Sequence, residues 1–462
     1  MEETPTINIG LLGFGTVGQG VYRYLQELYD SEKTGYNINI ARILVRDLNR
    51  PRTVDVNPAL LTTNPDDVLK YRLGGKPLDV IVEVMGGINP AGVLMLEALK
   101  SGIHVVTANK AFLTYGNSQK HKLSDKEIKR MHEQNEWPKD YNSMPLFVTT
   151  FSQNVNLGFE AAVAGEIPII EHLFRLPSTK EILGLEGIVN GTCNFILTQM
   201  ERGMSYNQAL KLAQEKGLAE ADPSFDVDGI DASQKLALLS SMLLGTKINL
   251  SDIQCEGITK VTKSDIECAN TFGYKIKHLA VVRRHSDGSI ELRVGPELVK
   301  RETTFATIAN ESNAVALYLK ERENPEIFIG NGAGAIPTAS AIVSDIVEVY
   351  RTPSESRSPI YNIFTGYPEK VRLHDPKTQW YLRLQANPGV ERVLRNTVLR
   401  NQFSSGVRIL KGPGDLGAAF PLDHVFITSE STEAQINDVL NDPRLAPYKV
   451  IPRLKLRIKK EI

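Results

Sequence analysis

The sequence predicts an α/β fold built on a Rossmann-type parallel sheet, with further domains behind it. An apolar run at residues 7–12 leads at once into the glycine-rich sequence GFGTVG. Apolar runs then alternate with helical patterns up to about residue 107, which is typical of strands and crossover helices in a parallel sheet. A chain of 462 residues is also too long for one hydrophobic core and favours two or three domains.

The glycine-rich turn lies between a strand and a helix, the setting in which GxGxxG indicates dinucleotide binding. Gly13 allows the tight turn, Gly15 lets the backbone approach a pyrophosphate, and Gly18 lets the helix pack on the strand. The helix N-terminus then offers free N–H groups to the phosphates. We expect the whole turn to bind the cofactor: Gly13, Phe14, Gly15, Thr16, Val17 and Gly18.

A second strand is predicted at residues 38–45, and it ends in Arg46 and Asp47. An acid at this strand end favours the ribose hydroxyl of NAD, whereas an arginine accommodates the 2′-phosphate of NADP. Both types stand side by side here, and the nearby Arg50 and Arg52 favour NADP over NAD. A solvated basic loop is the alternative.

Two further strands are predicted at residues 78–85 and 104–107, joined by a crossover helix at residues 90–101. Ligands bind at the carboxyl ends of strands in such a sheet. Gly86, Thr107 and Lys110 follow or end these strands and are therefore expected to face the cofactor cleft. A lysine that is simply solvated remains the alternative for Lys110.

The stretch at residues 220–235 holds five carboxylates and one lysine. Turn signals place the acids up to Asp228 on a loop, and a largely buried helix is predicted from Asp231 onward. Asp231 and Lys235 are four residues apart and share one helix face. A lysine that enters a buried helix is unfavourable unless it is paired, and Asp231 is the obvious partner. Acids that merely decorate a helix N-terminus are the alternative.

Residues 186–197 read as a strand followed by a polar turn that opens a helix. Thr192 or Asn194 is expected to cap that helix and to present N–H groups to a ligand. Cys193 has no histidine near it in sequence, so a small apolar filler is favoured over a nucleophile. The three cysteines lack close pairing, which argues against a disulfide framework and a zinc site.

Composition places the chain in the ordinary globular class, with 42% hydrophobic and 23% charged residues. A net charge of -1 gives no field that favours nucleic acid or an anionic membrane. No apolar run reaches the roughly 18 to 20 residues that span a bilayer. The N-terminus is acidic and lacks the apolar core of a secretory signal. We therefore expect a cytoplasmic protein with no nucleic-acid or membrane partner.

Several sequence blocks, in family order between residue 5 and about residue 350, carry a resemblance to homoserine dehydrogenases of amino-acid biosynthesis. They are GFGTVG at 13–18, TANKA at 107–111, FEAAVAG at 159–165, IVNGTCNFIL at 188–197, the stretch 220–235 and GNGAGAIPT at 330–338. The resemblance implies reversible NAD- or NADP-dependent hydride transfer between L-homoserine and L-aspartate 4-semialdehyde. That reaction belongs to threonine, methionine and isoleucine biosynthesis.

The resemblance also implies the roles of site residues. Lys235 would transfer the hydroxyl proton, and Lys110 would stand at the reacting oxygen. A lysine can do this near neutral pH if desolvation or a nearby cation lowers its pKa. Glu220 and Asp231 would bind the substrate ammonium and orient the lysine, with Asp226 in support. Thr192 would contribute backbone contacts, and Gly217 and Gly334 would lie against the cofactor.

A sodium site is implied as well, with Glu160 and the backbone of Val163, Gly165 and Ile167 as ligands. Oxygen ligands suit a hard cation. The chain departs from the family in two respects. The polar excursion at residues 117–145 is longer, and Glu166 and Ile336 stand where smaller residues are more usual.

The predicted division assigns nucleotide binding to residues 1–150, with 330–350 packing back on them. Residues 151–329 would bind substrate and dimerise, and 351–377 would be a linker. Residues 378–462 show the order βαββαβ of a ferredoxin-like fold. That segment resembles ACT regulatory domains, which implies feedback by L-threonine; a domain that only dimerises is the alternative. We expect a homodimer or homotetramer.

Two other functions are alternatives to a homoserine-oxidising enzyme. A non-catalytic nucleotide and amino-acid sensor predicts a broken lysine–acid constellation, whereas Lys110, Glu220, Asp231 and Lys235 are all in place. A related amino-acid dehydrogenase with another substrate is disfavoured by the block at 220–235. The sequence shows no kinase domain before Thr6, which favours a monofunctional enzyme.

Overall fold

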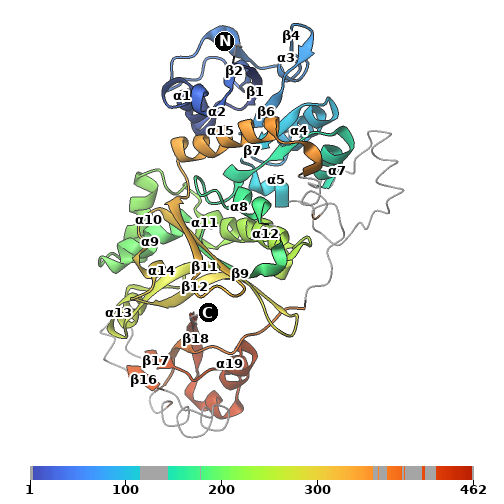
Figure 1. Ribbon diagram of the computed structural model, residues 1–462. Helices are drawn as coiled ribbons and strands as arrows, with labels where there is room; N and C mark the ends of the chain where they lie inside the picture. The colour runs from blue at the N-terminus through green and yellow to red at the C-terminus, as the bar shows by residue number, and fades with distance from the viewer. Residues whose placement is uncertain are drawn as a thin grey trace. The chain divides into compact units, whose positions relative to one another are not determined.

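The computed structural model describes residues 4–114, 144–176, 178–356, 363, 372–387, 390, 408–411 and 423–459. Nearly all of the predicted excursion at 117–145, about half of the 351–377 linker and most of the segment expected to form the first helix of the βαββαβ order therefore lie outside the described residues. The chain divides into two compact units (Figure 1). Unit 1 comprises Met1–Ile182, Gln234–Asp252 and Leu319–Lys370, and unit 2 comprises Leu183–Ser233, Ile253–Tyr318 and Val371–Ile462.

Unit 1 is built around a parallel sheet with the strand order β3-β2-β1-β6-β7-β8. Each neighbouring pair in this order is parallel. The predicted Rossmann-type sheet is confirmed. Strand β1 shows why it forms: Ile7, Ile9 and Leu11 are fully buried on one face, and Leu12 is buried as well. Such near-continuous apolar burial is what a parallel strand covered on both faces requires.

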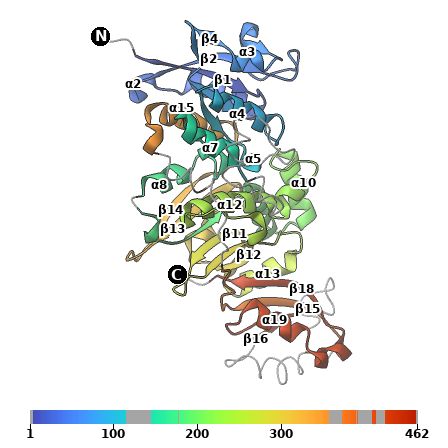
Figure 2. The same ribbon diagram turned by 90° about the vertical axis from the view of Figure 1, so that its right-hand side faces the viewer.

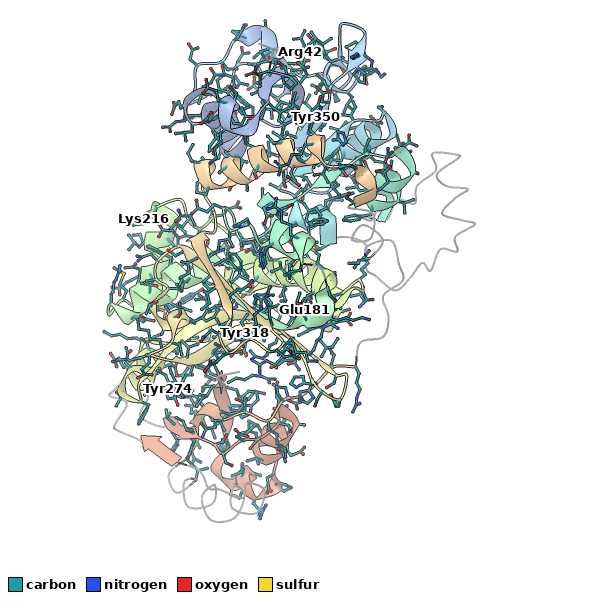
Figure 3. All side chains as sticks on the ribbon, viewed as in Figure 1. Arg42, Glu181, Lys216, Tyr274, Tyr318 and Tyr350 are labelled. Atoms are coloured by element: carbon teal, nitrogen blue, oxygen red, sulfur yellow. The ribbon has the colours of Figure 1, made fainter. Side chains whose placement is uncertain are left out.

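Helix α15 (Ala335–Arg351) covers this sheet beside α1 (Thr16–Glu27), as Figure 1 shows. Its buried face includes Ala339, Ile342 and Ile346. Near its end, the ring of Tyr350, labelled in Figure 3, meets that of Tyr36 edge-on at 5.5 Å between centroids. A segment late in the sequence thus completes the core of the N-terminal sheet.

The bounds of the elements of unit 1 follow the chain. They are β1 (Thr6–Leu12), α1 (Thr16–Glu27), α2 (Ser31–Thr34), β2 (Asn37–Leu44), β3 (Leu61–Thr62), α3 (Asp66–Leu69), β4 (Arg72–Leu73), β5 (Lys76–Pro77), β6 (Val80–Glu83), α4 (Ala91–Lys100), β7 (His104–Thr107), α5 (Lys110–Thr114), α7 (Met144–Gln153), β8 (Leu157–Gly158), η2 (Glu160–Ala162), α8 (Ile169–Arg175), β14 (Glu326–Asn331) and α15 (Ala335–Arg351). Helix α12 (Ile230–Leu244) begins in unit 2 and ends in unit 1.

Unit 2 contains a mixed sheet with the order β13-β9-β11-β12-β18-β15-β17-β16. Strands β9, β11 and β12 are antiparallel neighbours, and β12 continues in parallel to β18 near the C-terminus. Tyr318, labelled in Figure 3, donates its hydroxyl to buried Glu186 of β9 at 3.0 Å. The C-terminal segment therefore extends the sheet that begins in the middle of the chain.

The C-terminal part of unit 2 has the strand order β18-β15-β17-β16, with antiparallel neighbours throughout. Helix α19 packs on these strands (Figure 2), and its Ile436 and Val439 join a core with Trp380, Leu382 and Phe426. The strands and the second helix predicted for this segment are confirmed. No described helix combines the length and apolar character that a membrane span requires.

The bounds of the elements of unit 2 are these: β9 (Ile182–Ile188), α9 (Gly191–Glu201), α10 (Tyr206–Glu215), α11 (Ser224–Val227), β10 (Gln254–Cys255), α13 (Lys263–Thr271), β11 (Tyr274–Arg284), β12 (Ile290–Lys300), α14 (Thr304–Thr307), β13 (Ser312–Leu319), β15 (Trp380–Gln385), β16 (Arg408–Lys411), β17 (Asp423–Ile427), α19 (Glu433–Leu440) and β18 (Ile451–Ile458).

Candidate active site

The glycine-rich turn joins β1 to α1 in unit 1. Gly13 has a φ of 106°, a conformation that side chains rarely adopt. A Cβ on Gly18 would lie 2.4 Å from the carbonyl oxygen of Gly13, so only glycine lets the helix approach this closely. A Cβ on Gly15 would meet nothing within 4 Å. The backbone of Gly15 is therefore open to a ligand, at the N-cap of α1.

The basic loop after β2 folds toward this turn. Arg52 donates hydrogen bonds to the carbonyl oxygens of Asp47, Leu48 and Arg50 at 2.8 to 2.9 Å. Its guanidinium lies 6.0 Å from the centroid of the Phe14 ring. Arg46 is exposed at the start of the loop. Arginine and the glycine turn are thus brought to the same end of the sheet.

A buried carboxylate organises the ends of β6 and β7. Glu83 is fully buried and accepts hydrogen bonds from the N–H groups of Met85 and Gly86 at 2.8 and 3.0 Å. It also accepts one from the hydroxyl of Thr107 at 2.6 Å. Burial raises the pKa of the Glu83 carboxyl, although these donors act against the rise. Glu83 therefore joins two residues that the sequence predicts to face the cofactor, Gly86 and Thr107.

Lys110 begins helix α5 directly after β7. The preceding Asn109 is buried and donates to the carbonyl oxygen of Gly87 at 2.6 Å, while its backbone N–H donates to Thr107 at 3.0 Å. Lys110 is half-buried. The loop after β6 and the lysine after β7 are therefore held together at the carboxyl edge of the sheet.

Two aspartates of the acidic stretch meet at one asparagine in unit 2. Asn190 donates both of its amide hydrogens, to Asp226 at 2.7 Å and to Asp231 at 2.9 Å. Asp231 and Asn190 are buried, and Asp226 is half-buried. The structure thus brings Asp226 and Asp231 together, whereas Glu220 is exposed on the loop that follows α10.

The cap of α9 differs from the prediction. Neither Thr192 nor Asn194 caps this helix: Asn190 is the N-cap, and its side-chain oxygen accepts from the N–H of Cys193 at 2.7 Å. The helix begins one residue later at Gly191, where a Cβ would lie 2.7 Å from the carbonyl oxygen of Glu311. The predicted loop up to Asp228 is also interrupted by the short helix α11.

The hydroxyl of Thr192 has a structural partner instead. It donates to the carbonyl oxygen of Leu218 at 2.7 Å, which holds the segment from Gly217 to Glu220 beside the start of α9. Gly217 has a φ of 72°, a left-handed conformation that favours glycine. Cys193 is buried and its thiol donates to the carbonyl oxygen of Asp226 at 3.2 Å.

Helix α12 carries Asp231 in its first turn and Lys235 one turn later, on the same face. Both side chains are almost completely buried, at 4% and 8% exposure. A carboxylate and an ammonium group at this spacing can move a proton and hold a cationic group of a substrate.

The predicted cation loop of unit 1 runs from Glu160 to α8. Buried Glu160 accepts from the N–H groups of Ile170 and Glu171 at 2.8 and 2.7 Å. Burial, followed by the negative charge of Asp345, raises the pKa of Glu160 to about 8. Between Val163 and Ile167 the backbone turns through left-handed conformations at Ala164 and Gly165. Among the described residues, no group of three or more acidic, histidine or cysteine side chains forms a metal cluster.

Gly334 is the N-cap of α15 and has a φ of 126°. The adjacent Ala335 lies close to α1, because a Cβ on Gly20 of that helix would lie 2.5 Å from the carbonyl oxygen of Ala335. The loop at residues 330–334 thus belongs to the same unit as the glycine-rich turn.

Sequence reasoning missed three residues of this arrangement: Asn190, Glu83 and Asn109. Only Asn190 had a signal in the sequence, because an asparagine between a predicted strand and a predicted helix is a strong N-cap candidate. Nothing local distinguishes Glu83 from any acid at a strand end, since its partner Thr107 is 24 residues away.

The chain is similar to proteins named homoserine dehydrogenase along nearly its whole length. A family model described as homoserine dehydrogenase matches residues 168–347, and one described as homoserine dehydrogenase, NAD binding domain, matches residues 13–133. Proteins named homoserine dehydrogenase from Bacillus subtilis and Neisseria gonorrhoeae are each 34% identical to this chain, with 94% of both chains covered.

Solved structures are similar as well. A homoserine dehydrogenase from Thiobacillus denitrificans superposes with a TM-score of 0.77 at 31% identity and covers 98% of each chain. One from S. aureus superposes with a TM-score of 0.68 at 28% identity and covers 99% of this chain and all of that chain. Because the relatives from Bacillus subtilis and Neisseria gonorrhoeae are 34% identical over 94% of this chain, the chain belongs to the homoserine dehydrogenase family.

Proposed function

We propose that this protein interconverts L-homoserine and L-aspartate 4-semialdehyde with a nicotinamide cofactor, and that Lys235 transfers the proton. The observation that supports these roles is the placement of two buried groups, Asp231 and Lys235, one turn apart on α12. Asp226 is joined to Asp231 through Asn190. Carboxylates beside a lysine suit a substrate that carries both an ammonium group and a hydroxyl.

In the oxidation of homoserine, the C4 hydroxyl proton would pass to Nζ of Lys235, acting as general base, as the C4 hydride leaves the substrate. The nicotinamide ring, when bound, supplies the hydride acceptor. Lys110 would stabilise negative charge on the reacting oxygen. Asp231 and Glu220 would bind the substrate ammonium, with Asp226 in support. In the reverse direction, Lys235 would return the proton to that oxygen as general acid.

A matched pair of lysine variants tests this role. Lys235→Met should lower kcat by about 10²- to 10⁴-fold, the contribution of a positioned proton-transfer group, with nucleotide affinity retained. Lys247→Met is the control, because Lys247 is also a buried lysine and lies shortly after α12; its activity should stay near that of the wild type. Retained kcat in Lys235→Met would exclude the proposed role. An inactive wild type that binds nucleotide and threonine would favour the sensor.

For the cofactor, we propose a preference for NADP over NAD. The exposed Arg46 and the loop held by Arg52 support it, because arginine accommodates a 2′-phosphate. Arg46→Ala should lower kcat/KM for NADP by about tenfold, the loss of one charge-assisted contact, and leave that for NAD nearly unchanged. Equal losses with both nucleotides would contradict the assignment.

We also propose a sodium site at Glu160 and the backbone oxygens of Val163, Gly165 and Ile167. One buried carboxylate and a turn of backbone carbonyls fit a hard monovalent cation. Burial and the charge of Asp345 raise the pKa of Glu160 to about 8, so its carboxylate form is unfavourable unless a cation compensates for it. The bound ion would order the loop before α8.

For residues 378–462, we propose an ACT-like regulatory role with L-threonine as effector. The order β18-β15-β17-β16 is the one expected of a ferredoxin-like sheet. A cavity of about 700 Å³ lies between β12 and this segment. It is lined by charges of both signs, including Arg293, Glu297, Glu433 and Lys455, which suits a zwitterionic amino acid.

A cavity-filling variant tests the effector. Ala434 is exposed and lines the cavity at α19. Ala434→Phe should abolish inhibition by L-threonine, while basal kcat and KM stay unchanged. Threonine inhibition that survives the substitution would exclude this cavity. Absence of threonine binding to the wild type by calorimetry would leave the alternative role, dimerisation.

The remaining assignments concern domains and assembly. We propose that residues 1–150 and 330–350 bind the nucleotide, and that 151–329 bind substrate and form a dimer contact. The 351–377 segment would link them to the C-terminal part. We further propose a cytoplasmic homodimer or homotetramer. Light scattering on the purified protein distinguishes these two assemblies from a monomer.

A further inference from the structure

Asn190 is a buried amide that uses both of its N–H hydrogens and its oxygen in hydrogen bonds. It lies at the junction of β9 and α9 and is 3% exposed. The side-chain oxygen accepts from the N–H of Cys193 at 2.7 Å. The nitrogen donates its two hydrogens to Asp226 and Asp231, at 2.7 and 2.9 Å. A primary amide has two donors and one acceptor oxygen, so this orientation cannot reverse without losing all three bonds.

The two aspartates come from different elements. Asp226 is in the short helix α11, and Asp231 is in the first turn of α12. Like charges that share one small volume repel each other, and a neutral group with two donors offsets that repulsion without adding a charge. The cap on α9 fixes the amide, and the amide in turn fixes both carboxylates.

We propose that Asn190 is a positioning residue for the reaction: it holds Asp226 and Asp231 at the separation and orientation that the homoserine ammonium group requires. The inference rests on the substrate-binding roles proposed above for these two aspartates. Asn190 itself acts through them and needs no contact with the substrate. Its contribution is geometric, because small displacements of binding groups lower the rate by large factors.

Serine separates the two roles of Asn190. Asn190→Ser keeps an N-cap oxygen for α9 but removes both donors to the aspartates. The matched control is Asn194→Ser in the same helix. Asn194 is also buried, but its amide donates to the carbonyl oxygen of Ser312 at 3.1 Å. Both substitutions remove a buried amide, so a general loss of packing should lower Tm in both.

Steady-state kinetics then identify the positioning role. Asn190→Ser should lower kcat/KM for L-homoserine by about 10- to 100-fold, mainly through KM, with KM for the nucleotide within about twofold of the wild type. Asn194→Ser should lower Tm without this selective rise in KM. Equal kinetic behaviour of the two variants would overturn the proposal and leave Asn190 as a structural cap.

A double-mutant cycle distinguishes failure of this inference from failure of the proposed substrate site. Asp231→Asn alone reports on the role of Asp231: wild-type kcat/KM for homoserine would overturn that role, and this inference with it. If Asp231→Asn is impaired, Asn190→Ser added to it should lower kcat/KM by less than about threefold, because the two residues act as a unit. A full independent loss in that background would overturn the positioning role alone.

Discussion

At the scale of single residues, Glu160 makes a prediction about pH and sodium. Its folded pKa, about 8, lies above the ordinary value because of burial and the neighbouring Asp345. A carboxyl with a raised folded pKa binds its proton more tightly in the folded state than in the unfolded state. This tighter proton binding stabilises the folded protein fully at pH values below the unfolded pKa of about 4.5. The stabilisation is lost as pH rises toward the folded pKa of about 8. A sodium ion bound at the proposed site would stabilise the carboxylate and remove this loss.

Thermal unfolding in choline chloride and in sodium chloride measures the effect. In choline, Tm should decrease between about pH 5 and pH 8 more steeply than in sodium. Glu160→Gln has no carboxyl to titrate and should show little difference between the two salts. A wild-type protein whose pH dependence is the same in both salts would argue against a cation at this loop.

Residue identity alone predicts some of these features and not others. The tight turn at Gly13 and the close helix approach at Gly18 follow from the motif, because each requires a missing side chain that the sequence shows directly. The role of Asn190 does not follow, because its carboxylate partners are 36 and 41 residues away. The cap of α9 was misassigned for a similar reason, since Asn190, Thr192 and Asn194 are all good capping types. The structure decides among them, because α9 begins at Gly191 and the side-chain oxygen of Asn190 accepts from the N–H of Cys193.

At the scale of elements, two glycines of the β1–α1 turn should respond differently to alanine. Gly15→Ala meets nothing in the protein, so Tm should stay within about 1 °C of the wild type. Gly18→Ala places a methyl group against the carbonyl oxygen of Gly13, so it should destabilise the protein by about 1 to 3 kcal/mol.

Nucleotide titrations complete this comparison. Both variants should bind the dinucleotide at least about tenfold more weakly, Gly15→Ala because the methyl group meets the pyrophosphate itself. Gly18→Ala weakens binding through the displaced turn. Wild-type affinity in Gly15→Ala would show that the pyrophosphate does not approach this backbone.

Glu83 links the carboxyl ends of β6 and β7 through its hydrogen bonds to Gly86 and Thr107. Glu83→Met removes both acceptor oxygens and leaves the N–H groups of Met85 and Gly86 and the hydroxyl of Thr107 without this acceptor. We expect a loss of about 1 to 3 kcal/mol in stability and weaker nucleotide binding, because the loop at Gly86 loses its anchor. Thr107→Val removes one of the three bonds to Glu83 and the acceptor of the Asn109 N–H, but it leaves the bonds from Met85 and Gly86 in place. It should therefore have a smaller effect on both quantities. Chemical denaturation measures the stability of the two variants, and nucleotide titration measures their affinity. If the Thr107 variant lost more stability and affinity than the Glu83 variant, Glu83 would not be the group that organises these strand ends.

At the scale of the whole molecule, the sequence predicted β1, β2, β6, β7, β9 and the C-terminal strands, but it predicted neither β11–β14 nor the sharing of cores. Tyr381, Leu454 and Leu456 of the C-terminal strands belong to one buried cluster with Cys193 and Ile276. Period-2 patterns identify these strands one by one, and they contain no information about which distant apolar face covers them. The C-terminal segment is thus part of unit 2 and not an appendage.

A buried polar contact joins the C-terminal strands of unit 2 to helix α13 of the same unit. Asp265 of α13 is fully buried and lies 3.0 Å from the guanidinium of Arg383, and it accepts the hydroxyl of Tyr381 at 2.8 Å. Removal of one partner from a buried ion pair leaves the other charge uncompensated, at about 3 to 5 kcal/mol. Asp265→Ala should therefore destabilise unit 2 strongly.

Calorimetry shows whether this contact makes the C-terminal part unfold together with the rest of the unit. For the wild type, unfolding of unit 2 should be a single transition, since its parts share a core. In Asp265→Ala the C-terminal part should melt at a lower temperature, as a separate transition. The proposed inhibition by threonine should weaken, while basal homoserine oxidation is largely retained at low temperature.

Tyr381→Phe keeps the ring in the core and the ion pair intact. It should therefore lower the free energy of unfolding by only the contribution of one hydrogen bond, about 1 kcal/mol. A single transition in Asp265→Ala, with threonine inhibition unchanged, would mean that the shared apolar core alone couples the two parts.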